Sequence, residues 1–219
     1  MSEMKLQGVT VTSRVEGLAA GIVVARDVAV APSSETLSAE IAEAIAVAPE
    51  DPGAPKNQVR DLLRFGKYKP TGRGKPASEY LLKAAKDERF PAINNLVDIN
   101  NLVSLSTLLP ISLIDVDRAE DDAFVLRRGH AGESFIFNAG GQTIDLTDLL
   151  LVARAKDDLA CANPVKDSLR TKLQDDASRV MAVIYAPTTL ADQARAATEL
   201  FVRLLEREGA TVEAGVIST

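Results

Sequence analysis

The sequence predicts an α+β fold in which helices pack on a mixed or antiparallel sheet. Short β-branched runs are interleaved with segments that carry apolar residues at helical spacing, which indicates helices among short strands of mixed direction. The 219 residues are 46% apolar, so the chain can bury a sizeable core. Because only 4% are aromatic, we expect Leu, Val, Ile and Ala to fill that core. We expect one domain over residues 1–219.

The N-terminal part, residues 1–90, is expected to contain early strands, helices and a basic loop. The run GIVVARDVAV is rich in β-branched residues, and Ser34 or Ser38 can cap the start of a helix. Prolines and a glycine at 49–55 predict a loop. The expected elements are strands at 9–15 and 21–30 and helices at 34–48, 57–65 and 77–86, after a polar terminus at 1–7.

The central part, residues 91–187, begins with a helix and continues as short strands. A broad apolar stripe over 92–109 predicts a buried helix that ends before Pro110. Gly140 and Gly141 can supply the positive φ of a hairpin. The expected strands are 124–127, 133–138, 142–146, 149–153 and 180–185, and a C-terminal helix follows within 188–208, amphipathic over 190–208, with Gly209 as its stop.

Positive charge is concentrated in one segment. The chain has a net charge of −6, but residues 56–89 hold ten Lys or Arg and four Asp or Glu, which gives +6 and leaves −12 for the rest. The segment is broken by glycines and prolines and contains Phe65 and Tyr68. Such a loop can follow a phosphate backbone and stack on bases, or it can be a solvated loop between helices. Its candidate nucleic-acid-binding residues are Arg64, Lys67, Lys69, Arg73 and Lys75.

The single histidine and single cysteine exclude several kinds of site. His130 and Cys161 cannot alone form a zinc site, a disulfide framework or a two-histidine metal centre. We therefore expect metal-independent chemistry without a cofactor, with His130 in a solvated turn and Cys161 as a small buried residue. One unpaired cysteine without a secretory leader, and apolar runs too short to span a bilayer, predict a cytoplasmic protein outside the membrane.

Polar side chains also gather between two expected strands. Residues 163–172 follow one strand and precede another, as in a binding loop held by a rigid scaffold. By itself, this pattern favours a binding loop only slightly over a solvated loop. The side chains are those of Asn163, Asp167, Ser168, Arg170, Thr171 and Lys172.

Residues 93–103 resemble a helix of a known protein family. Val97, Asp98 and Asn101 have the spacing of a helix that leads to a proline and a short strand in the B3/B4 domain, the editing module of the bacterial phenylalanyl-tRNA synthetase beta subunit. The similarity continues in order over about half of the chain, and the remainder is similar to free-standing proteins that carry the module without a synthetase. The further matching segments are 109–115, 125–127, 132–133, the glycine hairpin, 149–153 and 180–187.

This resemblance implies an α+β editing domain that hydrolyses an amino acid wrongly esterified to tRNA. In the synthetase, the module removes tyrosine from the phenylalanine tRNA, because its pocket pairs with the extra hydroxyl group. Here Ser112 stands at the position of the family's histidine, and residues 162–171 contain no glutamate to bind that hydroxyl, with Asp167 as their only acid. The resemblance therefore does not carry tyrosine specificity over to this sequence.

Hydrolysis is still chemically accessible to such a site. An aminoacyl ester is activated, so positioning a water and polarising the carbonyl can suffice without a protein nucleophile. The candidate catalytic residues are Asn163, Asp167, Ser168 and Thr171, and the candidate substrate-binding residues are Asn101, Ser112, Arg170 and Lys172.

Three functions remain open from the sequence. The first is a trans-acting editing protein that hydrolyses a misacylated aminoacyl-tRNA. The second is a non-catalytic module that binds tRNA or another RNA, since the family's histidine and glutamate are missing. The third is a protein that binds a free amino acid or another small metabolite, which the net negative charge favours.

Overall fold

Two sheets and a separate hairpin make up the β structure of this computed structural model, which describes residues 1–219. The five-stranded sheet has the order β1-β2-β5-β8-β9, and the four-stranded sheet has the order β11-β3-β10-β4. Every strand pair is antiparallel except β2 with β5, so the predicted mixed and antiparallel pairing is confirmed. The strands are β1 (Ser2–Leu6), β2 (Val9–Ser13), β3 (Leu18–Arg26), β4 (Ile111–Asp115), β5 (Ala123–Arg128), β6 (Ser134–Ile136), β7 (Thr143–Asp145), β8 (Leu150–Arg154), β9 (Ala160–Ala162), β10 (Arg179–Pro187) and β11 (Thr211–Ser218).

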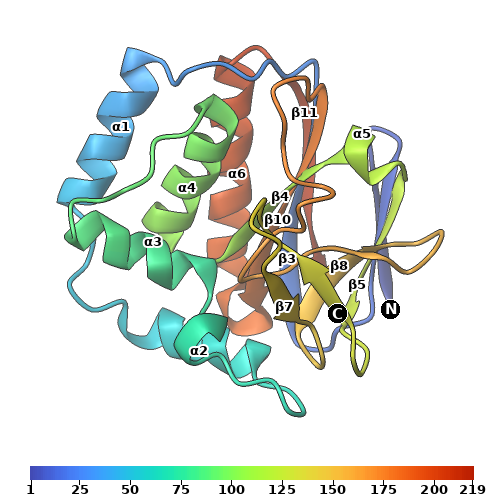
Figure 1. Ribbon diagram of the computed structural model, residues 1–219. Helices are drawn as coiled ribbons and strands as arrows, with labels where there is room; N and C mark the ends of the chain where they lie inside the picture. The colour runs from blue at the N-terminus through green and yellow to red at the C-terminus, as the bar shows by residue number, and fades with distance from the viewer.

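All helices except the short α5 gather on one side of the molecule (Figure 1). Helix α6 packs on β3, β10 and β11, α4 packs against α6, and α1 and α3 pack against α4. This arrangement confirms the predicted α+β class. The helices are α1 (Glu35–Ala46), α2 (Gly53–Leu63), α3 (Ala77–Lys86), α4 (Asn95–Thr107), α5 (Val116–Ala119) and α6 (Ala191–Arg207), with short 3-10 turns η1 (Gly72–Gly74) and η2 (Thr188–Leu190).

Helix α4 is the buried helix that the sequence predicts, with shorter ends. Asn94 caps it by accepting a hydrogen bond from the amide of Val97 at 3.0 Å, so it begins at Asn95 rather than at residue 92. It ends at Thr107 because Leu108 adopts a φ of 59°. Nine of its residues are buried, which makes it a rigid wall for whatever lies beside it.

Helix α2 begins inside the stretch predicted to be a loop. Its first residue is Gly53, and Pro55 is its third. A proline is tolerated there because the amides of a first helical turn have no partner within the helix. The predicted helix at 77–86 is α3 at the same residues, and Ser34 caps α1 by accepting from the amide of Leu37.

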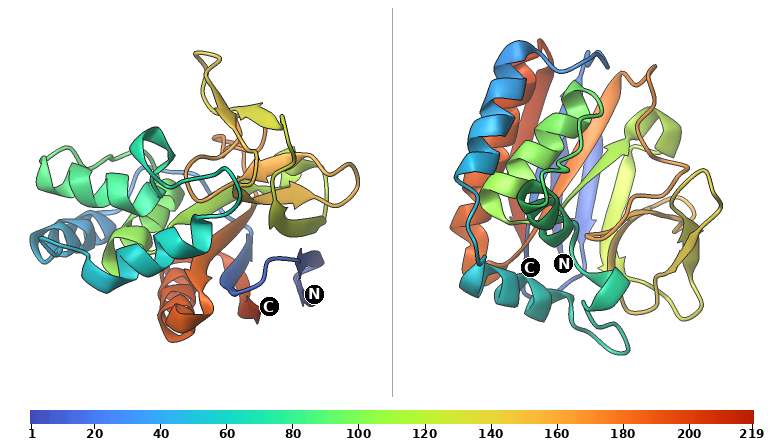
Figure 2. Two further views of the ribbon diagram at one scale, coloured as in Figure 1. Left: turned by 90° about the horizontal axis from the view of Figure 1, so that it is seen from below. Right: turned by 60° about the vertical axis from the view of Figure 1, so that its left-hand side comes forward.

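The residue pattern did not predict β1, β4, β9 or β11, although the family resemblance implies a short strand at β4, and four predicted strands are shorter: those at 9–15, 21–30, 133–138 and 142–146. The outer strands β1 and β11 alternate exposed and half-buried residues, so no apolar run marks them. The internal strands β4 and β9 are short. The strand predicted at 21–30 is β3, which ends at Arg26 because Asp27 has a φ of 58°. The chain ends meet where Ser2 Oγ donates to the carbonyl of Ser218 at 2.7 Å (Figure 2).

Aliphatic residues fill the main core, as predicted. One cluster of 45 buried residues extends from Val9 to Ile217, and its only aromatic members are Phe124, Tyr185 and Phe201. A smaller cluster around Phe135 lies beneath the β6–β7 hairpin. Because both ends of the chain contribute to the main cluster, the sheets and helices are held as one packed body.

Candidate functional site

A cleft opens between helices α3 and α4 and the segment 163–172 that connects β9 to β10. It encloses about 410 Å³. Apolar side chains such as Leu81, Val97 and Leu113 line its walls. Of the eight predicted catalytic and substrate-binding residues, the cleft brings together Asn101, Asp167 and Lys172.

Asp167 supplies the carboxylate of the cleft. Its side chain is half-buried, and the amide of Leu113 donates to its Oδ2 at 3.4 Å. Burial raises the pKa of Asp167 to about 6, although the Ser112 hydroxyl, the Leu113 amide and the charges of Lys172 and Lys166 act in the opposite direction. The carboxylate is therefore ionised at pH 7 and more basic than an exposed aspartate, which suits a general base.

Two neighbouring asparagines of α4 bring unpaired amide groups to the cleft. Asn101 is 8% exposed, and its side chain makes no hydrogen bond within the protein. Asn100 also lines the cleft, and its Oδ1 is buried without a partner. A buried polar atom without a partner, such as Asn100 Oδ1, is rare because it has lost the hydrogen bonds it had in water. These groups are thus available to a ligand.

Two lysines place positive charge at the edge of the cleft, and neither forms an ion pair. Lys172 donates through Nζ to the carbonyl of Phe137 at 3.0 Å. Lys166 Nζ lies 5.8 Å from the centroid of the Tyr80 ring and 5.4 Å from that of Phe137. Sequence reasoning missed Lys166, Tyr80 and Asn100 as functional candidates. The two aromatic neighbours of Lys166 are distant in sequence, so spacing gave no signal for that group.

Ser112 and Asn163 lie beneath the floor of the cleft, in a buried chain of hydrogen bonds. Tyr185 donates through its hydroxyl to Ser112 Oγ at 3.1 Å, and Ser112 Oγ donates to the carbonyl of Asn163 at 3.0 Å. Asn163 Oδ1 in turn accepts from the amides of residues 165 and 166 at 2.8 and 2.9 Å. The chain thus fixes the turn that carries Lys166 and Asp167.

Thr171 also lies inside the protein. It is buried, and its Oγ1 donates to the carbonyl of Cys161 at 2.9 Å. Cys161 is the small buried residue that the sequence predicts, and burial raises the pKa of its thiol to about 12. Thr171 and Cys161 together join the segment 163–172 to strand β9.

Ser168 and Arg170 face a second hollow, on the other side of the same segment. This hollow encloses about 560 Å³ and is also lined by Arg118. Ser168 Oγ accepts from the amide of Arg170 at 3.3 Å, and Arg118 Nε donates to the carbonyl of Arg170 at 3.2 Å. The structure therefore divides the predicted site residues among the cleft, the interior and this second hollow.

The carboxylates of the second hollow already have partners. Arg127 binds both oxygens of Glu133 at 2.9 Å and Asp158 Oδ1 at 2.7 Å. Burial acts to raise the pKa of Glu133, but Arg127 and the backbone amide of His130 outweigh it and lower that pKa. His130 is exposed, as predicted, and its Nε2 lies 2.8 Å from Asp158 Oδ2.

The basic loop, residues 64–76 between α2 and α3, lies beside the cleft. Tyr80 of α3 donates through its hydroxyl to the carbonyl of Gly72 at 2.9 Å, and Tyr68 donates to that of Gly74. Tyr68 packs against the core, so its ring is not free to stack on a base. Among the predicted nucleic-acid-binding residues, Arg64 pairs with Asp61, whereas four form no ion pair: Lys67, Lys69, Arg73 and Lys75.

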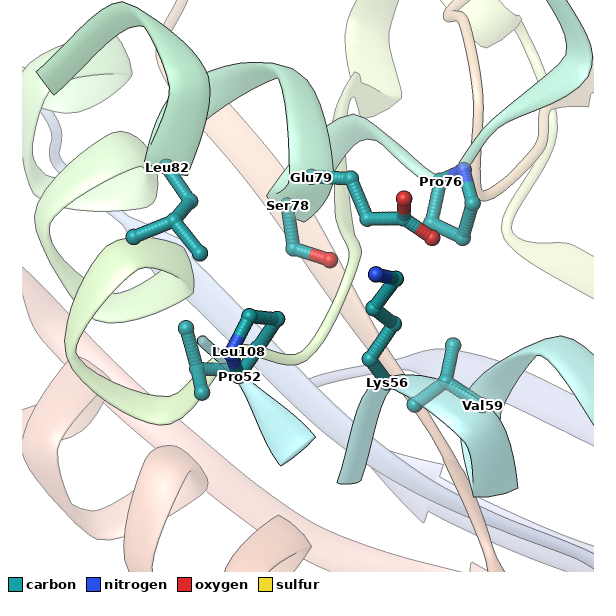
Figure 3. Close-up of a pocket in the computed structure, with 8 residues that line it drawn as sticks. All are labelled: Pro52, Lys56, Val59, Pro76, Ser78, Glu79, Leu82 and Leu108. Carbon is teal, nitrogen blue, oxygen red and sulfur yellow. The ribbon is translucent and has the colours of Figure 1, made fainter. Parts of the chain in front are cut away.

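A separate hollow between α2 and α3 does not have the size of a ligand site (Figure 3). Lys56 points toward Ser78 and Glu79, and Leu82 closes another side. The space is about 10 Å³, room for about one water molecule. Glu79 is already bound by Arg60 at 2.6 Å, so its carboxylate does not lack a partner.

No group of three or more His, Cys, Asp or Glu side chains is arranged to hold a metal ion. No helix combines the length and the apolar character needed to cross a membrane.

Comparisons with known proteins agree with this fold. Among solved structures, the chain is similar to an N-terminal fragment of the phenylalanyl-tRNA synthetase beta-subunit from Pyrococcus horikoshii, with a TM-score of 0.54 and 9% identity. The match covers 100% of this chain and 57% of that fragment, and at this identity it shows the fold alone. No curated protein matches the sequence. The sequence model of the B3/4 domain matches residues 69–207, and the chain therefore belongs to the B3/4 domain family.

Proposed function

We propose that this chain hydrolyses the ester bond of a misacylated aminoacyl-tRNA, acting in trans, with the cleft beside Asp167 as its active site. One observation carries the proposal: a single cleft in a B3/4 domain joins a basic carboxylate, the unpartnered amide of Asn101 and two lysines. The charges and donors suit the activation of water and the stabilisation of a tetrahedral intermediate. An aminoacyl-tRNA substrate also implies that the protein acts in the cytoplasm.

In this proposal Asp167 takes a proton from a water molecule, whose oxygen attacks the ester carbonyl carbon. Asn101 donates through Nδ2 to the carbonyl oxygen, which becomes negative in the tetrahedral intermediate. The bond between that carbon and the ribose oxygen then breaks, and the proton on Asp167 passes to the leaving oxygen. The products are a free amino acid and a tRNA with an intact terminal ribose.

The walls of the cleft favour a particular kind of amino acid. Leu81, Val97 and Leu113 offer apolar surface to its side chain, and Asn100 Oδ1 offers an acceptor. A side chain with both an apolar body and a hydrogen-bond donor matches these groups best. A purely aliphatic side chain leaves the acceptor unpaired.

The deciding experiment is a deacylation panel with tRNAs that carry different wrong amino acids. We expect the protein to accelerate hydrolysis of at least one of them above the spontaneous rate, and Asp167→Asn to remove most of that acceleration. Asp175→Asn is the matched control, because Asp175 is an exposed aspartate in the same connection between β9 and β10. If no tRNA in the panel is deacylated faster than in buffer, the proposal is wrong.

The pH dependence provides a second readout. Because the pKa of Asp167 is about 6, the fraction of ionised base grows about tenfold per pH unit below that value. We expect the single-turnover rate, corrected for spontaneous hydrolysis, to rise about fivefold between pH 5 and pH 6, where the titration already begins to saturate, and to level off above pH 7. A flat profile would show that Asp167 is not the base.

A second candidate function is binding of a free amino acid without hydrolysis. It is favoured by the charges of the cleft, since Asp167 can pair with an ammonium group and Lys166 or Lys172 with a carboxylate. A ligand that binds the native state raises the unfolding temperature. A thermal-shift screen with amino acids distinguishes the two, because a stabilising amino acid together with inactivity in the deacylation panel supports the second candidate.

A further inference from the structure

A second pocket adjoins the cleft and shares Tyr80 and Lys166 with it. It encloses about 580 Å³ and lies between α3, the basic loop and the β6–β7 hairpin, which projects away from the two sheets (Figure 2). Arg73 comes from the basic loop, and Phe137 and Gln142 come from the hairpin. We call it the hairpin pocket.

We propose that the hairpin pocket binds a nucleotide at the 3′ end of an RNA, with its base against Tyr80 and its phosphate between Arg73 and Lys166. The inference rests on the proposed function, because the tRNA ester that enters the cleft is attached to such an end. It adds a binding site and names the group that occupies it.

Aromatic surface is the first argument. The Tyr80 side chain is an exposed large hydrophobic group, 40% accessible, on the wall shared by the cleft and the pocket. Phe137 is half-buried on the opposite wall. Stacking of a flat base on an exposed ring is favourable, and it tolerates any base because every base has a π face. These rings suit a nucleobase.

Charge is the second argument. Lys166 Nζ lies near both rings, and neither Lys166 nor Arg73 forms an ion pair. Lys69 and Lys75 of the same loop also form no ion pair, so Arg73 is not the only cation of this loop without an acidic partner. Unpaired cations beside aromatic rings match a phosphate joined to a base.

The pocket is also held in shape by contacts outside its walls. Lys172 binds the carbonyl of Phe137, and the amide of Leu169 donates to the carbonyl of Ile136 at 2.8 Å. Both contacts join the hairpin to the segment that carries Asp167. A ligand in the hairpin pocket therefore lies at a fixed distance from the proposed active site.

The test is binding of uncharged RNA, so that hydrolysis plays no part. Fluorescence anisotropy compares the full 219-residue chain with an RNA hairpin that has a short single-stranded 3′ tail and with the same hairpin without the tail. We expect tighter binding of the tailed RNA, and about a tenfold loss of that affinity in Tyr80→Leu, as for one stacked base. In Arg73→Gln we expect weaker binding and a salt slope reduced by about 0.7.

Two controls separate stacking from other effects. Tyr80→Phe keeps the ring but loses the hydrogen bond to the carbonyl of Gly72, and we expect it to bind like the unaltered protein. Lys83→Ala removes an exposed lysine of α3 that pairs with Asp87 at 2.9 Å and lies outside the pocket, and we expect no change there either. If Tyr80→Phe weakens binding as much as Tyr80→Leu, the role of Tyr80 is to anchor the loop, and the proposal fails.

The other outcomes of these experiments decide which of the two proposals stands. Equal binding of tailed and blunt RNA would overturn the inference. Displacement of the tailed RNA by adenosine monophosphate at the same concentration as by unlabelled tailed RNA would assign the pocket to a free nucleotide and overturn its assignment to an RNA end. Tail-dependent binding without deacylation removes the hydrolase proposal alone, whereas deacylation that survives Tyr80→Leu, with unchanged RNA affinity, removes this inference alone.

Discussion

The two hollows on either side of residues 163–172 differ in how their polar groups are satisfied. In the cleft, the Asn101 amide has no partner, and Lys166 has no acidic partner. In the second hollow, Glu133 and Asp158 are both bound by Arg127. The two spaces have similar size, so volume does not distinguish them.

This difference teaches which hollow is built for a ligand and which for stability. A protein that leaves a buried polar atom such as Asn100 Oδ1 unpaired gives up stability unless a ligand completes it. A buried arginine shared by two carboxylates instead satisfies its own charge within the chain. We therefore assign chemistry to the cleft, and the expected effects of substitutions on the two sides differ accordingly.

The largest expected effect is on the rate of deacylation. Asn101→Ala removes the proposed donor to the ester oxygen, so we expect the rate to fall about 100-fold to 1000-fold, a loss of about 3 to 4 kcal/mol. Ser168→Ala and Arg170→Ala alter the second hollow and are expected to stay within about twofold. Single-turnover assays on a tRNA that the panel identifies provide the measurement. A loss in Ser168→Ala equal to that in Asn101→Ala would move the active site to the second hollow.

The next largest effect concerns stability and belongs to the second hollow. Arg127→Met keeps the length of the side chain but leaves the carboxylate of Glu133, 15% exposed, without its partner. We expect the free energy of unfolding to fall by about 3 kcal/mol, as for a buried ion pair that loses one member. Urea unfolding measures it. The folded variant is expected to keep its deacylation rate, and a rate loss as large as that in Asn101→Ala would contradict the separation of roles.

The third expected effect is a difference in sign: ionisation of Asp167 in the cleft costs stability, whereas ionisation of Asp158 in the second hollow contributes stability. In the folded protein Asp167 keeps its proton up to about pH 6, whereas in the unfolded chain it loses it near the ordinary value of 3.8. Ionisation of Asp167 therefore costs stability as the pH rises through this window. At pH 7.5 we expect Asp167→Asn to stabilise the protein by about 2 kcal/mol, with most of the gain absent at pH 4.5.

The opposite change in stability is expected for Asp158→Asn. Burial acts to raise the pKa of Asp158, but His130 and Arg127 outweigh it and lower that pKa, so its ionised form contributes stability at neutral pH. We expect Asp158→Asn to lower the unfolding temperature at pH 7.5. Thermal unfolding of both variants at the two pH values checks the signs, and a destabilised Asp167→Asn at pH 7.5 would refute the comparison.

The smallest effect concerns the layer beneath the cleft. Tyr185→Phe removes the hydrogen bond to Ser112 Oγ, while Ser112 keeps its bond to the carbonyl of Asn163. We expect a loss of about 1 kcal/mol in the free energy of unfolding, the usual value for one neutral hydrogen bond. Urea unfolding measures it. A loss as large as that in Arg127→Met would show that this chain of hydrogen bonds carries more than local stability.

Much of the fold was predictable because it depends on local patterns. The period of apolar residues predicts α3, α4 and α6, and Ser34, one of the two predicted cap residues, lies where α1 begins. The outer strands β1 and β11 were not predictable in this way, since half-exposed strands carry no apolar run. Strand β1 is placed by its pairing with β2, and β11 by its pairing with β3. Because β3 lies far from β11 in the sequence, no local pattern marks that pairing.

The candidate site was predictable in part. The sequence indicates that residues 163–172 form a polar connection and that basic residues gather at 56–89. It does not show which way each side chain points, because an irregular connection has no fixed period. That direction is decided by contacts with distant elements, such as the hydrogen bond from the amide of Asp115 to the carbonyl of Thr171 at 2.9 Å.

The sequence by itself determined the α+β class, the aliphatic core, the resemblance to the B3/4 family and the scarcity of histidine and cysteine. These follow from composition, period and short motifs, which act within a few residues. Only the tertiary structure decided that Asp167 shares a cleft with Asn101 while Ser168 does not, and that Lys166 lies near Tyr80 and Phe137. The physical reason is that burial, charge pairing and hydrogen-bond satisfaction depend on neighbours in space, and the folded chain alone sets those neighbours.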